Sequence, residues 1–284
     1  MSVAPEHHGG SGTPLLLLHG FTDTWRAWTP LLGALEEHHE VLAPTLPGHH
    51  GGTPWPDEVA MSVDATVDLI ERRMEAAGWE TAHIAGSSYG GWLALELATR
   101  GRARSVVGIC PAGGWEHGSK EADHVYGYFE RTHRTMRLAV PKVMELIAKR
   151  PRLRKLALRE LVAHPERVPS RCAMDMMEGA KGCAIVAEAI AMGRQEGSWS
   201  ELGPIDVPVR IAYGSRDWLI RWPSHYGRLQ RLLPNAEFVP LDDCGHLPMW
   251  DDPPQVSRAI LDVTTAVDRA AEGSAGDDSA AALR

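Results

Sequence analysis

The sequence predicts an α/β fold, a doubly wound and mostly parallel sheet with an inserted helical cap. Short apolar runs alternate with segments of helical period, which is the pattern of successive right-handed βαβ units. One of these runs leads directly into a Gly-x-Ser-x-Gly turn and then into a helix. Later, about ninety residues of helical pattern separate two strands, which indicates the cap.

The composition limits the class of protein. The chain has 284 residues, 44% of them hydrophobic, which suits one large domain or a core with one insertion. Its net charge of -8 argues against a general nucleic-acid binder. Residues 1–13 lack the apolar run of a signal peptide, and no segment approaches about 18 uninterrupted apolar residues. We therefore expect a soluble, cytoplasmic protein without stable membrane insertion.

The four cysteines give no framework for a disulfide or a metal site. Their scattered spacing fits a reducing compartment. The paired histidines, such as His49-His50, are better interpreted as surface or loop residues than as ligands. The cysteines are Cys110, Cys172, Cys183 and Cys244.

The first apolar run, residues 14–18, is typical of a parallel strand that is buried on both faces. It ends at His19-Gly20-Phe21, a loop that either is a plain turn or presents backbone N–H groups to developing negative charge. The elements expected next are a helix over 25–36, a strand over 40–43 and a helix over 62–77 with Ser62 as its N-cap.

The stretch over 82–94 has the pattern of a nucleophile elbow. A serine hydroxyl is a weak nucleophile at neutral pH, so it must be held where a base can reach it. A tight turn between a strand and a helix lifts it above the sheet edge. Gly86 and Gly90 frame Ser88, whereas a motif centred on Ser87 would need glycines at 85 and 89. Ser88 is the candidate nucleophile, and a helix is expected over 89–99.

The predicted cap covers residues 112–202 and separates two parts of the core, 1–111 and 203–272. Residues 273–284 are rich in Gly, Ser, Ala and Asp, so we expect a disordered tail there. The strands on either side of the cap are expected over 104–110 and 207–213. Helices are expected within it over 140–149, 153–163, 170–178 and 182–192.

Two features of the cap leave alternatives open. Residues 131–171 contain twelve Lys or Arg and three Glu, about +9, which indicates either a solvated helix face or a surface that attracts anions. Six methionines either fill the cap core or form an adaptable pocket for an acyl or alkyl group. They are Met136, Met144, Met174, Met176, Met177 and Met192.

An acid and a base follow the later strands. Asp217 comes after the strand over 207–213, and His246 comes after a strand over 237–241. The chain order Ser88, Asp217, His246 matches the order that a strand-elbow architecture imposes on a catalytic triad. The rival acids are Asp206, Asp242 and Asp243, and the remaining helices are expected over 223–233 and 254–270.

Taken together, these motifs resemble the α/β-hydrolase superfamily over residues 14–270. The resemblance implies Ser88 as nucleophile, His246 as base and then acid, and Asp217 as the residue that orients it. It also implies the N–H groups of Phe21 and Tyr89 as an oxyanion hole. The motifs are His19-Gly20-Phe21, Gly86-Ser87-Ser88-Tyr89-Gly90-Gly91, Gly214-Ser215-Arg216-Asp217 and Gly245-His246-Leu247-Pro248.

Serine at the nucleophile position is unlike the haloalkane dehalogenase and epoxide hydrolase branches of that superfamily, whose nucleophile is aspartate. The lipase-type His-Gly-Gly-Gly run is absent, and the N-terminal segment is short for the pair of leading strands that many members have. Trp115, Trp218 and Trp250 fall beside predicted strand ends, where they would either wall a pocket or simply pack.

The predicted function is a capped, carboxylesterase-like serine hydrolase that cleaves a carboxylic ester with a small or medium acyl group. It needs no cofactor and no metal, and its partner is a small-molecule ester or other acyl substrate. One alternative is a hydrolase of carbon-carbon bonds in diketo acids, which uses the same triad. A non-enzyme alternative is a small-molecule receptor on the same fold. The oligomeric state does not follow from the sequence.

Overall fold

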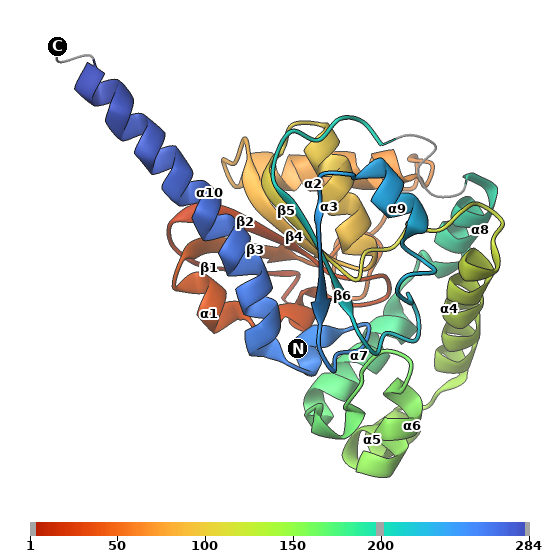
Figure 1. Cartoon of the computed structure of the whole chain (residues 1–284). Coiled ribbons are helices and arrows are strands. Elements are labelled where there is room, and N and C mark those ends of the chain that lie inside the picture. Colours follow the sequence, from red (N-terminus) through yellow and green to blue (C-terminus); the bar gives the residue numbers. More distant parts are fainter. Residues whose placement is uncertain (1–3, 197–201, 282–284) are drawn as a thin grey trace.

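The structure is a computed structural model that describes residues 4–196 and 202–281, and its centre is a seven-stranded sheet (Figure 1). The strands lie in the order β1-β3-β2-β4-β5-β6-β7, and every neighbouring pair is parallel except β1 with β3. The predicted fold class is therefore confirmed. The strands are β1 Glu6–Gly10, β2 Thr13–Leu18, β3 His39–Pro44, β4 Ala82–Ser87, β5 Ala103–Ile109, β6 Val209–Gly214 and β7 Glu237–Leu241.

The central strands are buried on both faces, which explains why they are continuous apolar runs. In β2, Leu15 and Leu17 belong to the core on one face and Leu16 and Leu18 to the core on the other, because successive side chains of a strand alternate. All four leucines are fully buried. Each such burial stabilises the fold by about 1.5–3 kcal/mol, so this short run is a strong determinant of the sheet.

Helices cover both faces of the sheet (Figure 1). α2 (Val63–Ala76), α3 (Tyr89–Thr99) and α9 (Gly227–Leu232) pack on the face of Leu16 and Leu18. α1 (Leu32–Glu36) and α10 (Pro253–Ala281) pack on the opposite face. The carboxyl ends of the parallel strands remain available for functional loops.

The start of α2 is as predicted. Ser62 is its N-cap, and Ser62 Oγ accepts a hydrogen bond of 3.0 Å from the N–H of Ala65. Such a cap satisfies one of the unpaired N–H groups of the first turn. The helix predicted over 25–36 is instead two pieces, the 3₁₀ turn η1 (Trp25–Trp28) and α1. Pro30 lies between them and cannot continue a helical hydrogen-bond pattern.

Both ends of the chain differ from the prediction. β1 lies in a segment with no strand prediction, because it is an edge strand whose polar side chains face outward, as His8 does toward Glu40 at 2.8 Å. At the other end, α10 continues past the expected limit at residue 270. α10 extends to Ala281 and so runs through most of the segment over 273–284 for which a disordered tail is predicted, although the Gly, Ser and Asp residues there are weak helix formers. Residues 282–284 lie outside the described residues.

Between β5 and β6 the described chain is helical, in the region of the predicted cap. Residues 197–201, near its predicted end, lie outside the described residues. The N–H of Ala184 donates to the carbonyl of Gly48 at 2.9 Å, which fastens this segment to the core. We call its helices the cap helices: α4 Lys120–Leu138, α5 Pro141–Lys149, α6 Pro151–Leu158, α7 Ser170–Gly182 and α8 Val186–Glu196. Within residues 4–196 and 202–281, none of the helices combines the length and the apolar composition that crossing a bilayer requires.

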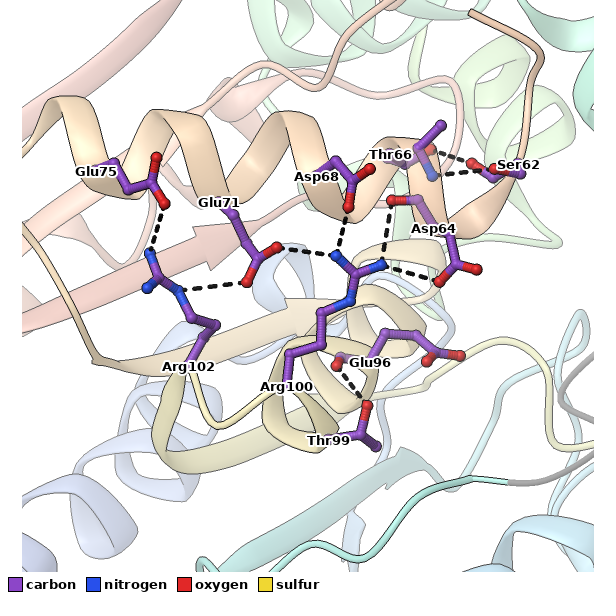
Figure 2. A network of polar contacts seen from close by, with 11 residues as sticks. Ser62, Asp64, Thr66, Asp68, Glu71, Glu75, Glu96, Thr99, Arg100 and Arg102 are labelled. Carbon is purple, nitrogen blue, oxygen red and sulfur yellow. Dashed lines mark hydrogen bonds and ion pairs between the residues drawn. The ribbon is translucent and has the colours of Figure 1, made fainter.

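An ion-pair network joins α2 to the end of α3 (Figure 2). Carboxylates along one face of α2 surround Arg100, the residue that ends α3, with the shortest N–O distance at 2.5 Å, to Asp68. Exposed pairs contribute little to stability one by one, but a shared guanidinium fixes the register of two helices. The network therefore orients α3, which begins directly after Ser88. Its members are Asp64, Asp68, Glu71, Glu75, Arg100 and Arg102.

A second network is buried at the amino ends of the strands and holds α10. His83 is fully buried and pairs with Asp268 of α10 at 3.0 Å, while Thr13 donates to the same carboxylate at 2.6 Å. His39, also fully buried, contacts Thr264 of α10 at 2.8 Å. Burial lowers the pKa of both histidines, and the nearby His83 lowers that of His39 further, although Asp268 partly opposes the shift of His83.

We predict that this network makes the fold sensitive to acid. A histidine whose pKa is lower in the folded protein binds its proton mainly in the unfolded chain. The free energy of unfolding therefore has its full value above about pH 6.5 and decreases as the pH falls below it. The slope is at most about 1.4 kcal/mol per pH unit for each histidine. Urea unfolding at pH 5, 6, 7 and 8 should show the decline, and His83→Gln should reduce its slope. The exposed His38→Gln is the matched control; equal slopes in all three proteins would contradict the prediction.

Candidate active site

Ser88 occupies the turn between β4 and α3 in a backbone conformation that few residues adopt. Its φ is 53° and its ψ is -115°, in the region that disfavours side chains. The surrounding backbone holds it there. The N–H of Ser88 donates to Ile109 at 2.9 Å, and the carbonyl of Ser88 accepts from Ala112 at 2.9 Å. A strained backbone conformation that several surrounding contacts hold in place is typical of functional turns.

Glycines allow the turn to be this tight. A Cβ at Gly86 would lie 2.0 Å from the carbonyl oxygen of Gly90, and a Cβ at Gly90 would lie 2.1 Å from that of Leu18. Neither position accepts a side chain without moving the backbone. The loop after β2 crosses at the same place, since a Cβ at Gly20 would lie 3.3 Å from the Cβ of Ser88.

The two neighbouring serines are placed differently. Ser87 is the last residue of β4, it is fully buried, and its Oγ has no hydrogen-bond partner. Ser88 lines two recesses at the carboxyl edge of the sheet. The geometry therefore favours Ser88 over Ser87 as the reacting hydroxyl.

Asp217 and His246 form a buried pair. Asp217 Oδ2 lies 2.8 Å from His246 Nδ1, and both side chains are almost wholly excluded from water. Asp217 Oδ1 accepts hydrogen bonds of 2.8 Å from the N–H groups of Leu219 and Ile220. These donors hold the carboxylate in one orientation, so its second oxygen can fix the imidazole with Nε2 facing outward.

The rival acids do not reach the imidazole. Asp206 and Asp242 are exposed. Asp243 is exposed as well and contacts Arg216 and His164, each at 2.7 Å. Among the four acids that the sequence leaves as candidates, Asp217 is the one that bonds to His246.

The loops that carry Asp217 and His246 are pressed together. A Cβ at Gly214 would lie 2.2 Å from the carbonyl oxygen of Gly245. Asp251 joins the His246 loop to the cap, since its carboxylate accepts from the N–H of Gly245 at 2.8 Å and from that of His164 at 2.8 Å. The position of His246 therefore depends on the cap segment that Asp251 binds.

Cys110, Asp217 and His246 place three possible metal-ligand atoms within 4.8 Å of one another. Burial, and then the charge of Asp217, raise the pKa of the Cys110 thiol well above its usual value. A thiol must lose its proton to be a good ligand, and Asp217 is already bonded to His246. The set suits a hydrogen-bonded pair beside a neutral thiol better than a metal site.

The loop after β2 is shaped by His19. His19 Nε2 accepts a hydrogen bond of 2.9 Å from the N–H of Leu46, so Nδ1 carries the proton and donates to the carbonyl of Gly20 at 2.8 Å. Burial, and then the nearby His49, lower the pKa of His19 well below its usual value, which keeps it neutral. This places Phe21 beside Ser88, and Tyr89 begins α3, where the first N–H groups have no partner within the helix.

An apolar recess with about 550 Å³ of empty space borders Ser88. Its phenols are already engaged, since Tyr126 donates to the carbonyl of Gly193 at 3.0 Å and Tyr89 contacts Thr66 at 3.1 Å. No Lys, Arg, Asp or Glu is among the described residues that line it. They are Phe21, Ser88, Tyr89, Trp92, Ala112, Trp115, Val125, Tyr126, Phe129, Ala189, Ile190, Met192 and Gly193.

A second recess with about 470 Å³ of empty space, here called the Asp23 recess, adjoins the first. It shares Phe21, Ser88 and Phe129 with the first, and His246 is also among its lining residues, so Ser88 and His246 border one space. Asp23 accepts a hydrogen bond of 2.8 Å from the N–H of Thr24. Burial raises the pKa of Asp23 to about 7 against this bond, and the neighbouring Asp175 adds to the rise.

Some of the other residues predicted for the pocket line one of the two recesses, and others do not. Trp115 and Met192 line the apolar recess, and Met176 lines the Asp23 recess. Trp218 is 56% exposed, and Trp250 packs against the core on the side of α1 and α10, so neither lines the described walls of the two recesses. Both residues lie close to strand-end loops in sequence, but Trp218 is exposed to solvent and Trp250 packs against the core.

Sequence reasoning missed Asp23. It lies two residues after Phe21 in a loop that was already a candidate for the oxyanion hole. An acid directly beside that loop was the available signal.

Comparisons with known proteins identify the family of the chain. A family model described as alpha/beta hydrolase fold matches residues 13–253. The chain is 34% identical over 203 residues to the epoxide hydrolase EphH of Mycobacterium tuberculosis, covering 70% of this chain and 94% of that protein. It is 32% identical over 127 residues to a 2-hydroxymuconate semialdehyde hydrolase of Pseudomonas sp., covering 43% of this chain and 44% of that protein. A thermophilic esterase from Thermogutta terrifontis has a similar structure, with a TM-score of 0.71 at 22% identity, covering 92% of this chain and 93% of that one.

Asp23 should make the acceptance of charged substrates depend on pH. Its carboxyl is mainly protonated below about pH 7 and negative above it. The ratio of kcat/KM for a carboxylate-bearing ester to that for a neutral ester should therefore fall from pH 6 to pH 8, by about tenfold at short range. Using the ratio cancels the titration of the catalytic base.

Asp23→Asn should make this ratio independent of pH. Asp175→Asn is the comparison variant, because Asp175 is a neighbouring acid outside the described lining of the recess. Its ratio should still fall with pH, with the midpoint at lower pH, since Asp175 adds to the raised pKa of Asp23. A pH-dependent ratio that persists in Asp23→Asn would contradict the assignment.

Proposed function

The chain belongs to the α/β-hydrolase fold family, and on that premise we propose that it is a serine hydrolase that cleaves carboxylic esters through an acyl-enzyme at Ser88. One observation carries the proposal. Ser88 and His246 line the same recess, and His246 is held from behind by Asp217 at 2.8 Å. Nucleophile, base and orienting acid are the parts that acyl transfer needs.

In the first step, His246 Nε2 removes the proton of Ser88 while Oγ attacks the ester carbonyl. The carbonyl oxygen becomes an oxyanion, and the N–H groups of Phe21 and Tyr89 are the proposed donors to it. Asp217 stabilises the imidazolium without taking its proton. The tetrahedral intermediate collapses, the bond from carbon to the leaving oxygen breaks, and the imidazolium gives its proton to the departing alcohol.

In the second step, a water molecule gives its proton to His246 and attacks the acyl carbonyl. The bond to Ser88 Oγ then breaks, the acid leaves, and the serine recovers its proton from the imidazolium. The apolar recess suits one hydrocarbon part of the ester, because it offers no charged side chain on its described walls.

The lining of the recesses favours a neutral ester over a diketo acid. A diketo acid carries a carboxylate, yet no Lys or Arg is among the described residues of either recess. Eleven of the twelve cations in residues 131–171 are exposed, and Arg154 is buried away from Ser88 among cap carbonyls. The basic residues of the cap therefore do not support an anionic substrate in the active site.

Epoxide opening does not suit a serine nucleophile. Attack of Ser88 on an epoxide carbon would leave an ether, which has no carbonyl for water to attack. A carboxylate nucleophile would instead leave an ester, which water can cleave. The similarity to a protein named an epoxide hydrolase therefore supports the fold and the hydrolase class rather than that substrate.

The proposed compartment is the cytoplasm. All four cysteines are free, and three of them are buried, which suits a reducing environment.

Ser88→Ala should lower kcat by about 10⁴–10⁶-fold and leave the fold intact, because it removes only the hydroxyl of a small side chain while the glycines of the turn remain. Ser87→Ala is the matched control and should be mild, since Ser87 Oγ has no partner to lose. A fluorophosphonate probe should label the wild type and Ser87→Ala. Labelling of Ser88→Ala at the wild-type level would show that the nucleophile is misassigned.

A substrate panel tests the reaction class. p-Nitrophenyl esters of rising acyl length should be hydrolysed, with kcat/KM highest where the chain fills the apolar recess. A ring-fission diketo acid and styrene oxide should give no turnover above the Ser88→Ala background. A higher kcat/KM for the diketo acid than for any ester would replace the ester assignment with carbon-carbon bond cleavage. Binding without turnover of any substrate would favour the receptor alternative.

A further inference from the structure

The exposed apolar side chains of this protein are concentrated in one short segment. Within the described residues, eight large apolar residues are exposed, and six of them lie between positions 138 and 156. Leu138 is 81% exposed and Leu156 is 62% exposed. Single exposed leucines are ordinary, but a cluster of them marks an interaction surface. The six are Leu138, Val140, Val143, Leu146, Leu153 and Leu156.

The cluster belongs to α5, α6 and the end of α4. Each of α5 and α6 buries one face, with Met144 and Leu158 among its buried residues, and turns a second apolar face outward. Figure 1 shows α5 and α6 at the outer end of the cap, away from the sheet and from the C-terminal end of α10. No residue of α5 or α6 is among the described residues that line the two recesses. Substrate binding therefore does not explain these outward side chains.

Buried contacts fix the two helices with their apolar faces outward. Arg154 is 6% exposed, and its guanidinium donates to the carbonyl of Glu166 at 3.1 Å and to that of Ala148 in α5. A buried guanidinium that joins α6 to α5 keeps the pair in one arrangement. The outward apolar face therefore results from a fixed packing of the two helices and not from a frayed helix end.

Basic residues surround the apolar ones. Residues 131–171 carry a net charge of +9, and since the whole chain carries -8, the remainder carries -17. Glu145 is the acid within α5, and it pairs with Lys149 at 2.5 Å. The exposed cations between residues 131 and 159 are Arg131, Arg134, Arg137, Lys142, Lys149, Arg150, Arg152, Lys155 and Arg159.

We propose that the outward faces of α5 and α6, together with Leu138 and Val140, dock on the surface of an anionic lipid bilayer. Leucine and valine side chains enter the boundary between head groups and acyl chains, while Lys and Arg contact the anionic head groups. The acidic remainder of the chain is repelled from the same surface, so the protein binds with the cap facing the membrane. The docking is peripheral, with no segment crossing the bilayer.

The edge of this surface carries an aromatic residue of the kind that suits a membrane interface. Trp218 is exposed and shares a recess with Arg159 at the end of α6. The guanidinium of Arg221 lies 5.3 Å from the centre of its ring. Indole rings favour the head-group level because they are amphipathic. Trp218 follows Asp217 directly, so the docked face borders the loop that carries the proposed catalytic acid.

Co-sedimentation with vesicles tests the proposal on the full chain. Vesicles of equal phosphatidylglycerol and phosphatidylcholine should bind the protein, and pure phosphatidylcholine should bind it at least tenfold more weakly. Binding should weaken as salt rises from 0.05 M to 0.5 M, because the Debye length falls from more than about 10 Å toward 3 Å. Ser88→Ala should bind as the wild type does, so the result does not depend on the proposed reaction.

Variants locate the surface. Val143→Glu and Leu156→Glu should each weaken binding to the mixed vesicles by at least tenfold, as should the double variant Arg152→Gln and Lys155→Gln. Val59→Glu is the matched control, because Val59 is an exposed valine outside the cluster. All of these variants should keep wild-type activity on a soluble neutral ester, which reports that they are folded.

Three results would overturn the proposal. The first is no binding to the mixed vesicles at 0.1 M salt. The second is equal loss in Val59→Glu and Val143→Glu. The third is self-association of the wild type in light scattering without vesicles that Leu156→Glu abolishes, which would identify the cluster as an interface between copies of this chain.

Discussion

The tight approach of backbone to backbone around Ser88 is the constraint on which the rest of the site depends. Three chain segments meet there: the end of β4, the loop after β2 and the turn after β5. Gly86, Gly90 and Gly20 let them approach closely, and hydrogen bonds to Ile109 and Ala112 hold the serine at a positive φ. The strand, the helix and both neighbouring loops all fix the backbone of Ser88. Because the serine side chain is short, the position of its hydroxyl is then fixed as well. The ion pairs of Arg100 act on the far end of α3 and preserve the same geometry.

The second half of the site is held by polar contacts rather than by close packing. Asp217 uses both oxygens, one for two backbone N–H groups and one for His246, so it has a single favourable orientation. Asp251 connects the loop of His246 with the cap in a similar way. Cap and core therefore share the task of positioning the imidazole. A change in the cap segment near His164 should be expected to act on the base, even though that segment lies far from Ser88 in sequence.

Much of this could be predicted because the deciding features are local in sequence. Apolar runs such as residues 15–18 must be strands buried on both faces, and Ser62 caps α2 because a serine there satisfies an N–H group. The family-level identification also follows from short motifs. The remainder depends on contacts between distant segments. β1 is polar because it lies at the edge of the sheet, which depends on its pairing with β3. The surroundings of Asp23 and the packing of Trp250 depend on the cap and on the opposite core, which no local pattern encodes.

The two adjoining recesses that share Ser88 also have a stereochemical consequence. One is lined by apolar groups, and the other contains a carboxyl, two threonines and the imidazole. Under the proposed function, a chiral carbon next to the reacting carbonyl that lies where the recesses join presents one of its substituents to each. Inverting that carbon exchanges the two substituents between the recesses, which leaves a hydrogen-bonding group unpaired in an apolar space. Under the proposed function we therefore expect the division of the cavity to favour one mirror image of a chiral ester, as well as a range of chain lengths.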